Sequence, residues 1–203
     1  MYTNKSKDKK LSKIILNEII GMIEMSFISF FVITMIFTFV LRIATIKGES
    51  MEPTLHSDER VLTSIWYRKP KNGDIVIIDC QEAVVFSEDD TLEYREGLGK
   101  HIVKRVIAVA GQKIDIDFEK GIVFIDDIAI DEPYIAGLTH NDLGAFAKNY
   151  PFTVPENYVF VMGDNRPVSR DSRDKKIGLV SEESILGEVI FRISPIENFG
   201  WIR

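Results

Sequence analysis

The pattern of apolar and polar positions divides the chain into an N-terminal apolar run and a long mixed region. Residues 25–41 carry no formal charge, and Arg42 ends the run. A helix of about twenty residues spans the roughly 30 Å apolar core of a bilayer. The run reaches that length if Arg42 extends its charge toward water and residues 43–46 continue the helix. The pattern therefore predicts a transmembrane anchor over residues 25–46.

Charges on the two sides of the run indicate how such an anchor would be oriented. Only Arg42 and Lys47 follow the run before acidic residues appear, whereas several lysines precede it. The preceding lysines are Lys5, Lys7, Lys9, Lys10 and Lys13. Because positive flanks stay on the cytoplasmic side, we expect residues 1–24 to form a basic cytoplasmic tail. Residues 47–203 are then expected on the extracytoplasmic side of the cell membrane.

Two other interpretations of the apolar run are a cleaved secretory signal and a buried core helix. A secretory signal has a shorter apolar region, followed by small residues at the minus-three and minus-one positions. The segment Arg42-Ile43-Ala44-Thr45-Ile46 offers no such site. No second apolar run of spanning length follows, so the pattern favours an uncleaved, single-pass anchor.

Beyond the anchor, short runs of β-branched and aromatic residues are separated by turn residues, which is typical of strands. The runs cover residues 75–79, 83–86, 101–109, 113–116, 121–125, 158–162 and 185–193. We therefore expect a mostly β fold, with one antiparallel domain and a smaller inserted β subdomain at about residues 111–155. Two polar stretches, 87–99 and 137–151, are expected to be surface loops. Roughly 155 residues suffice for one such domain with a sizeable core.

Composition narrows the classes of partner and ligand. The formal net charge is −6, and the basic residues are concentrated in the tail, so the exported part is more acidic than the whole. An acidic surface argues against nucleic acid as a partner. Cys80 is the only cysteine, which excludes an internal disulfide and a cysteine cluster for zinc. We expect neither a metal nor a cofactor.

Four local groups of residues remain once the core-forming runs are set aside. They are Ser50-Met51-Glu52-Pro53-Thr54-Leu55, Gly73-Asp74-Ile75-Val76, Val103-Lys104-Arg105-Val106-Ile107 and Gly163-Asp164-Asn165-Arg166-Pro167-Val168-Ser169-Arg170-Asp171-Ser172-Arg173. The last group is dense in charged and hydroxyl side chains directly after an apolar run. Taken alone, it is equally a solvated turn with satisfied side-chain hydrogen bonds.

Lys104 lies inside one of the expected strands. Neighbouring residues of a strand point to opposite faces, so Lys104 and Arg105 cannot both face solvent in a flat strand. A buried lysine loses hydration, which lowers its pKa and makes a neutral amine available near pH 7 or 8. The alternative is a lysine on an edge strand that extends its charge to water.

Together the four groups resemble the bacterial type I signal peptidases, which are membrane-anchored serine proteases with a Ser-Lys dyad. The groups occur in that family's order behind a single anchor, and the resemblance extends to about Leu186. It implies that Ser50 is the nucleophile and that Lys104 is the general base. It also implies a mostly β fold and an insertion between the lysine group and the last group.

The same resemblance implies roles for residues around the dyad. Ser169 would orient Lys104, and Asp171 and Arg173 would form a structural pair with Asp164 nearby. Some members carry a serine that helps to bind the oxyanion where this chain has Gly48. Without that side chain, the backbone N–H of Ser50 must supply one contact, and no second donor is identified. Gly48 is equally a plain turn residue.

The implied substrates are exported precursor proteins with signal peptides, cleaved at small-x-small sites beside membrane lipid. The resemblance also implies that the substrate binds as an extended strand, with small side chains in shallow apolar pockets. Candidates to line these pockets are residues near Ile46, Ile75, Val76, Val103 and Val106. Specificity would come mostly from the exclusion of large side chains.

Several alternatives remain at this point. A Ser-His-Asp enzyme could use His56 or His101, although no G-x-S-x-G elbow is present. Self-cleaving transcriptional repressors share this kind of core, but the DNA-binding helices they carry are missing here. The serine β-lactamase pattern fails, because the S-x-x-K at Ser6 lies in the tail. A catalytically inactive binding module also remains, as does an unrelated anchored β domain in which Ser50 and Lys104 lie apart.

Overall fold

The computed structural model describes residues 3–67, 69–87, 89, 91–146 and 149–202. The chain divides into two compact units, residues 1–41 and 42–203, and the second is called the β unit below. The expected fold class is confirmed: one apolar helix lies near the N-terminus, and antiparallel strands dominate the rest.

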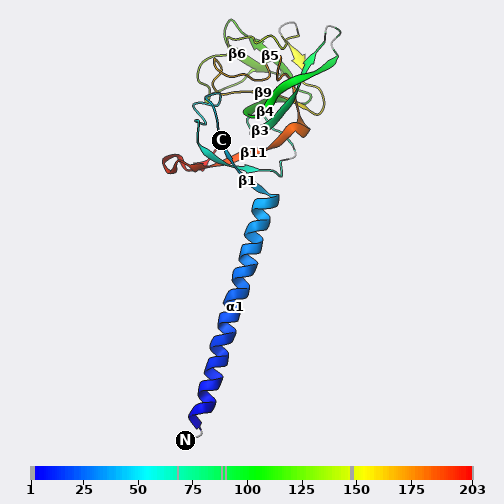
Figure 1. Ribbon diagram of the computed structural model, residues 1–203. Coiled ribbons are helices and arrows are strands. Elements are labelled where there is room, and N and C mark those ends of the chain that lie inside the picture. Colours follow the sequence, from blue (N-terminus) through cyan, green and yellow to red (C-terminus); the bar gives the residue numbers. More distant parts are fainter. Residues whose placement is uncertain (1–2, 68, 88, 90, 147–148, 203) are drawn as a thin grey trace. The chain divides into compact units, whose positions relative to one another are not determined.

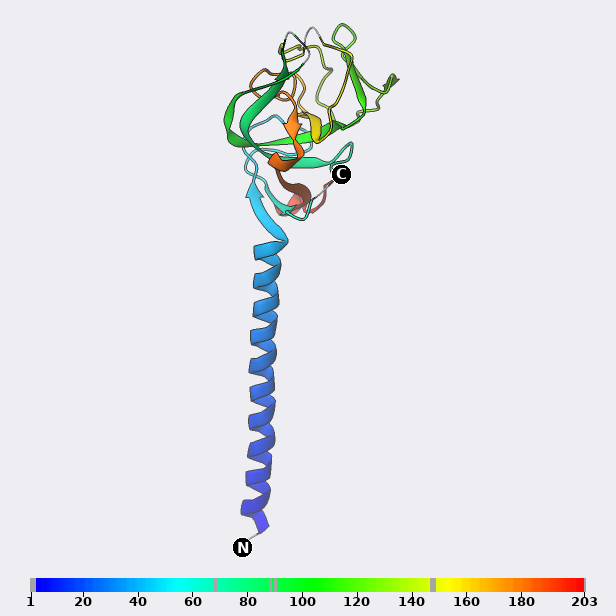
Figure 2. The same cartoon turned by 90° about the vertical axis from the view of Figure 1, so that its right-hand side faces the viewer.

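The first unit consists mainly of the helix α1, Thr3–Phe39 (Figures 1 and 2). Its segment Ile15–Phe39 is long and apolar enough to cross a membrane by length and composition, and none of its residues is buried. The hydroxyls of Ser26, Thr34 and Thr38 each donate a hydrogen bond to the carbonyl one turn earlier. The helix therefore satisfies its own polar side chains, as an apolar surrounding requires.

The helix differs at both ends from the expected anchor at residues 25–46. It begins earlier, and the apolar segment already starts at Ile15. It ends at Phe39, and β1 follows as Leu41–Thr45. The expected helical extension is therefore wrong for residues 41–45. The β-branched side chains of this short segment suit a strand, and β1 pairs with β2, Arg60–Ser64.

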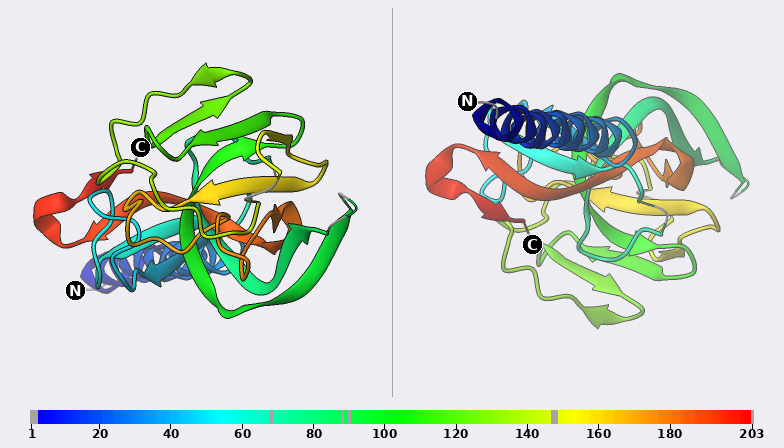
Figure 3. Two further views of the ribbon diagram at one scale, coloured as in Figure 1. Left: turned by 90° about the horizontal axis from the view of Figure 1, so that it is seen from above. Right: turned by 90° about the horizontal axis from the view of Figure 1, so that it is seen from below.

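The β unit is built on an eight-stranded sheet in the order β1-β2-β11-β3-β4-β9-β10, with β12 added on β11. Its further strands are β3, Ile75–Phe86; β4, Leu92–Val109; β9, Tyr158–Met162; β10, Val180–Ser181; β11, Ile185–Ser194; and β12, Gly200–Trp201. Two short 3-10 helices, η1 (Glu182–Ser184) and η2 (Ile196–Asn198), flank β11. Figure 3 shows the arm formed by β11, η2 and β12, in orange to red, at one edge of this unit.

A second, four-stranded sheet has the order β7-β6-β5-β8. Its strands are β5, Lys113–Asp117; β6, Ile122–Ile125; β7, Ile128–Ala129; and β8, Phe152–Thr153. All four lie within the stretch 111–155, at the end of the β unit away from β1 (Figures 1 and 2). One buried cluster joins both sheets, because it contains side chains of β3 and β4 together with those of β5, β6 and β8. The insertion is thus packed on the main sheet through a shared core.

The structure departs from both expected surface loops, one in its secondary structure and the other in its burial. Most of 87–99 is strand, because β4 begins at Leu92 and pairs with β3 from Phe86 onward. Its charged residues occupy exposed positions of a two-stranded ribbon, which gives the segment the composition of a loop. The stretch 137–151 has no strand in its described part, yet Phe146 is fully buried in the shared core. Residues 147–148 lie outside the described residues.

A smaller core cluster lies under the turn that follows β1. It contains Met51 and Leu55 of that turn, Val61 of β2, Ile75 of β3 and Val189 of β11. Met51 and Leu55 are 1% and 0% exposed. Burial of such a side chain contributes about 1.5–3 kcal/mol to the stability of the fold. Apolar packing of Met51 and Leu55 therefore holds the turn that carries Ser50 on the core.

Candidate active site

Ser50 lies in the turn between β1 and β2. Its next neighbour, Met51, points into the core, and the N–H of Leu55 donates to the carbonyl of Met51. The backbone N–H of Asn165 donates to the carbonyl of Ser50 at 3.1 Å, and the amide of Asn165 donates to the carbonyl of Glu49 at 3.1 Å. The core and the 163–173 loop therefore hold the Ser50 backbone from two sides.

Lys104 lies on β4, opposite Val76 of β3, and is 3% exposed. Its Nζ donates hydrogen bonds to Ser50 Oγ at 2.7 Å and to the carbonyl of Val103 at 2.8 Å. The structure thus brings together two residues that are far apart in the sequence. This contact removes the alternative in which Ser50 and Lys104 lie apart.

The environment of Lys104 lowers its pKa from 10.5 to about 8. Burial is the largest cause, because it disfavours the charged ammonium. The carboxylates of Asp171 and Asp164 act in the opposite direction, and the charge of Lys100 adds a further lowering. The loss of hydration dominates, so a large fraction of the amine is neutral in mildly alkaline solution and can accept the proton of a serine hydroxyl.

Ser50 and Lys104 open onto a cavity of about 460 Å³. Its other lining residues are Ala44, Thr45, Lys47, Gly48, Glu49, Ile77, Leu98, Lys100, His101, Ile102, Val103, Val168 and Arg170. Val103 itself is among the pocket candidates from the sequence, and Thr45 and Lys47 beside Ile46 and Ile77 beside Val76 also line the cavity. The side chains of Ile46, Ile75, Val76 and Val106 are themselves buried in the core clusters.

Asp164 and Arg105 form a buried ion pair behind Lys104. Arg105 Nε donates to Asp164 Oδ1 at 2.8 Å and Nη2 donates to Oδ2 at 2.7 Å. Thr54 Oγ1 donates to the same carboxylate at 2.5 Å, and Arg105 Nη1 donates to the carbonyl of Gly73 at 2.8 Å. This network connects all four residue groups singled out in the sequence.

Asp171 and Arg173 form a second buried pair, and both side chains are fully buried. Arg173 Nε and Nη2 donate to the two carboxylate oxygens of Asp171, each at 2.8 Å. Arg173 also donates to the carbonyl of Arg166 at 3.0 Å, and the N–H of Gly163 donates to Asp171 at 3.1 Å. The pair therefore fixes the backbone at both ends of the 163–173 loop.

We expect Asp171→Ala to lower the free energy of unfolding by about 3–5 kcal/mol, because it leaves the guanidinium of Arg173 buried without a counterion. The measurement is chemical denaturation of the detergent-solubilised full chain. Glu93→Ala removes an exposed carboxylate that pairs with Arg95, and this control should leave the unfolding midpoint unchanged. Equal midpoints for Asp171→Ala and the wild type would contradict a structural role for the pair.

Ser169 is buried, and its Oγ makes no hydrogen bond within the described part of the chain. It lies against Gly163, where an added Cβ would be 2.2 Å from Ser169 Oγ and 2.3 Å from the carbonyl oxygen of Ser50. Its expected role in orienting Lys104 is not visible as a hydrogen bond and stays a prediction. Gly163 was missed as a site residue, although a glycine between a strand and a polar loop is a signal of close backbone approach.

Gly48 has a φ of +87°, a left-handed conformation that favours glycine. Its N–H donates to Ser57 Oγ at 3.3 Å, and an added Cβ would meet open space. The backbone angle explains the glycine here without any role in catalysis. Its expected place at the oxyanion site therefore stays a prediction.

The two other arginines of the last loop differ in their surroundings. Arg166 is buried, pairs with Glu132 and donates to Thr139 Oγ1 at 2.7 Å. The alternative of a solvated turn for the last group is therefore wrong at Arg166, and no local pattern could indicate its partners in a distant segment. Arg170 is exposed, donates to Asp174 at 2.7 Å and lines the Ser50 cavity.

The histidines do not take the position of a base for Ser50. His56 and His101 have side chains that are 52% and 63% exposed, and they face Glu59 and Asp79 at 3.7 Å. Within the described part of the chain, the side-chain partner of Ser50 Oγ is the amine of Lys104. The geometry therefore gives no support to a Ser-His-Asp arrangement.

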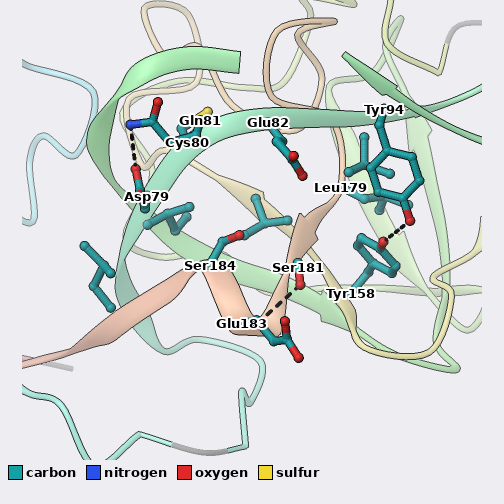
Figure 4. A pocket seen from close by; sticks show the side chains of 14 residues that line it. Asp79, Cys80, Gln81, Glu82, Tyr94, Tyr158, Leu179, Ser181, Glu183 and Ser184 are labelled. Carbon is teal, nitrogen blue, oxygen red and sulfur yellow. Dashed lines mark hydrogen bonds between the residues drawn. The ribbon is translucent and has the colours of Figure 1, made fainter. Parts of the chain in front are cut away.

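A second cavity, of about 550 Å³, is lined mostly by residues of β3 and of the segment from β10 through η1 to β11, with one tyrosine each from β4 and β9 (Figure 4). It shares no lining residue with the first cavity. The carboxylates that line it are Asp79, Glu82 and Glu183. The hydroxyls of Tyr94 and Tyr158 meet at 2.9 Å, and Ser181 Oγ accepts a hydrogen bond from the N–H of Glu183. No lysine or histidine is among the described residues that line it, so it lacks the serine–base pair of the first cavity.

Comparisons with known proteins cover most of the chain. The sequence profile of the family described as signal peptidase, peptidase S26, matches residues 19–194. The chain is 33% identical over 184 residues to "Signal peptidase IB" of Staphylococcus aureus (strain N315), across 85% of this chain and 87% of that protein. It is 33% identical over 165 residues to "Probable signal peptidase I-1" of Synechocystis sp., across 80% of this chain and 76% of that protein. The crystal structure of a signal peptidase I from Enterococcus faecalis V583 matches 60% of this chain and 97% of its own, at 26% identity and a TM-score of 0.42.

Proposed function

The chain belongs to the signal peptidase family of S26 peptidases, and from this premise we propose that Ser50 is its nucleophile and Lys104 its general base. Its activity is that of a serine endopeptidase that removes N-terminal signal peptides from exported precursor proteins. One observation carries the assignment of residues, the 2.7 Å contact between Lys104 Nζ and Ser50 Oγ in a cavity. The lowered pKa of the Lys104 amine supports it.

The proposed chemistry follows from these two side chains. When Lys104 is neutral, the Ser50 hydroxyl donates to Nζ and transfers its proton there while Oγ attacks the scissile carbonyl carbon. The ammonium of Lys104 then gives this proton to the departing amine, which leaves an ester on Ser50. A water molecule, deprotonated by the same amine, hydrolyses the ester. The backbone N–H of Ser50 is the proposed donor to the oxyanion.

The supporting residues act on the position of this dyad. We assign Asp171 and Arg173 to the scaffold of the last loop, and Asp164 to the network that joins Thr54 to Arg105. Ser169, which packs against Gly163 near the carbonyl of Ser50, is proposed to orient Lys104. No cofactor and no metal enters this reaction, because the amine supplies both the base and the acid.

The substrate is proposed to be a small-x-small segment in extended conformation. β1 is an edge strand of the main sheet, so an extended peptide can align with it. Ala44 and Thr45 of β1 and the aliphatic Ile102 and Val103 of β4 line the cavity beside Ser50. The whole cavity of about 460 Å³ must hold the extended backbone of the substrate as well as its side chains, so we propose that the subsite beside Ser50 accepts only a small side chain.

Location beside lipid is proposed from two exposed apolar surfaces. The segment Ile15–Phe39 of α1 is the proposed membrane span, with the lysine-rich N-terminus cytoplasmic and the β unit on the extracytoplasmic side. On the β unit, Ile196, Phe199 and Trp201 are 84%, 61% and 74% exposed in the arm shown in Figure 3. Aromatic side chains of this kind favour the interface of a bilayer. Membrane lipid is therefore a proposed partner.

The substrate proposal predicts a sharp dependence on the residue before the scissile bond. The full chain in detergent is incubated with a precursor that carries an Ala-x-Ala site, and the product is sequenced. Cleavage is expected after the second alanine, whereas a matched precursor with Trp there should be cleaved at least about a hundredfold more slowly, because the proposed subsite beside Ser50 accepts only a small side chain. Equal cleavage of the two precursors would contradict selection by exclusion.

A further inference from the structure

We propose that Glu59 and Arg192 form a positioning clamp that fixes the turn carrying Ser50 in register with Lys104. This inference rests on the proposed role of Ser50 as nucleophile and assigns both residues a role outside direct chemistry. Neither side chain lines the cavity of Ser50. They act through the backbone of the turn between β1 and β2.

The first part of the clamp is the side chain of Arg192, which lies on the main sheet. Arg192 lies on β11, opposite Val61 of β2, and its Nε is 2.9 Å from Glu59 Oε2. The side chains of Arg192 and Glu59 are 16% and 4% exposed. Neither of these two atoms makes a hydrogen bond within the described residues, so their contact is an ion pair by distance. The Nη2 of Arg192 donates to the carbonyl of Thr54. The guanidinium thus joins a buried carboxylate to the turn after Ser50.

Thr54 is held from its other side by the network behind Lys104. Its hydroxyl donates to Asp164 at 2.5 Å, and Asp164 pairs with Arg105, the neighbour of Lys104 on β4. One residue of the turn is therefore tied through its side chain to the lysine strand and through its carbonyl to β11. This double attachment limits how far the turn can shift relative to Lys104.

Glu59 also closes the base of the loop that contains Ser50. The N–H of Ile46 donates to the carbonyl of Glu59 at 2.9 Å, and the N–H of Asp58 donates to the carbonyl of Ile46 at 2.9 Å. The backbone of Glu59 thus holds the start of the loop, while its side chain holds the arginine that grips Thr54. The loop is fixed at its base and at its middle by one residue pair.

Burial of both charges is costly, and apolar side chains of similar size often give equal stability. Because this buried pair also contacts a backbone carbonyl of the turn that carries Ser50, we assign it the role of positioning that turn. Without Arg192, the Thr54 carbonyl loses this donor and faces the region of a buried carboxylate. Two acceptors without a donor between them repel, so the turn is expected to move.

The test measures kcat, KM and the pH profile of the full chain with an Ala-x-Ala precursor. Arg192→Met keeps the apolar stem and removes the donors. The double variant Glu59→Gln with Arg192→Met leaves no unpaired buried charge and serves if the single variant folds poorly. Val123→Ala, in the core of the second sheet, is the matched control, because it loses buried packing far along the chain from the turn.

We expect the clamp variants to lose about tenfold to a hundredfold in plateau kcat, since a shift of about 1 Å in a reacting group has an effect of this size. KM should stay within about twofold, and the rise of kcat with pH should keep its midpoint near pH 8. Val123→Ala should keep the wild-type kcat. Wild-type kcat in both clamp variants would overturn the proposal. So would a fall in kcat together with a shift of this midpoint toward pH 10.5, because such a shift means that water reaches Lys104 and the site has loosened.

The wild type and Ser50→Ala are measured in the same assay, so failure of the clamp and failure of the proposed function remain distinct. Clamp variants as fast as an active wild type, with Ser50→Ala inactive, overturn the clamp alone. An active Ser50→Ala overturns the proposed function and the clamp with it.

Discussion

Ser50→Ala is expected to abolish precursor cleavage, with kcat lower by about four to six orders of magnitude. Alanine lacks the Oγ that accepts the acyl group, so the covalent intermediate cannot form. The change removes one atom, and the packing of Met51 and Leu55 below the turn is untouched. The variant should therefore keep the unfolding midpoint of the wild type. The measurements are the cleavage rate of an Ala-x-Ala precursor and the midpoint in a denaturant titration.

Ser184→Ala is the matched control for this substitution. Ser184 lines the second cavity (Figure 4), which shares no lining residue with the cavity of Ser50 and Lys104, and its loss should leave the cleavage rate unchanged. A Ser50→Ala variant with more than a few per cent of wild-type activity would assign the nucleophile to another residue. A variant that is inactive but also unfolded would show only that Ser50 supports the turn, and the midpoint separates these two results.

The sequence predicts much of the fold where strands are long and apolar. Runs inside β3, β4 and β9 are rich in β-branched residues, and each lies in a strand of the structure. β1 could not be separated from the helix, because Leu41 belongs to the uncharged run and the mostly apolar residues after Arg42 can equally continue a helix. The strands β7, β8, β10 and β12 have two residues each. Two residues are too few to show the alternation of apolar and polar positions that is typical of a strand. The ribbon part of β4 is charged on its exposed positions, so its composition favoured a loop.

The sequence predicts the site where chemistry is local and fails where partners are distant. Lys104 stands out as a lysine inside an apolar run, the family resemblance implies its pairing with Ser50, and the structure brings the two side chains into contact. The partner of Arg166 is Glu132 and the partner of Arg192 is Glu59. Neither pairing leaves a local pattern, because strand order decides which segments meet. Within the candidate pocket stretches, the sequence could not tell which side chains line the cavity, since alternation along a strand does not show which face the core covers.

Lys104→Met is the second substitution with a very large expected effect. Methionine has nearly the length and the apolar character of the lysine stem, so it can fill the same space without an amine. Loss of a general base lowers the rate by about two to four orders of magnitude. In the wild type, the protonated amine cannot accept a proton, so activity should be low below pH 8 and rise as Lys104 becomes neutral. Because burial has lowered its pKa to about 8, this rise is expected well below the 10.5 of an exposed lysine.

The control for this prediction is Lys100→Met, on the same strand four residues before Lys104. Lys100 also lines the cavity, but it is exposed, and its charge lowers the pKa of Lys104 from a distance. Its removal should keep the plateau rate and move the midpoint of the rise of kcat to a slightly higher pH, because Lys104 loses one repelling charge. A pH titration of kcat from 6 to 10 on the wild type and both variants separates the two lysines. If the wild-type profile is flat, or if Lys104→Met cleaves at the wild-type rate, then the amine at position 104 is not the base, however close it lies to Ser50. If Lys100→Met alone loses the plateau, then the base has been assigned to the wrong lysine of the strand.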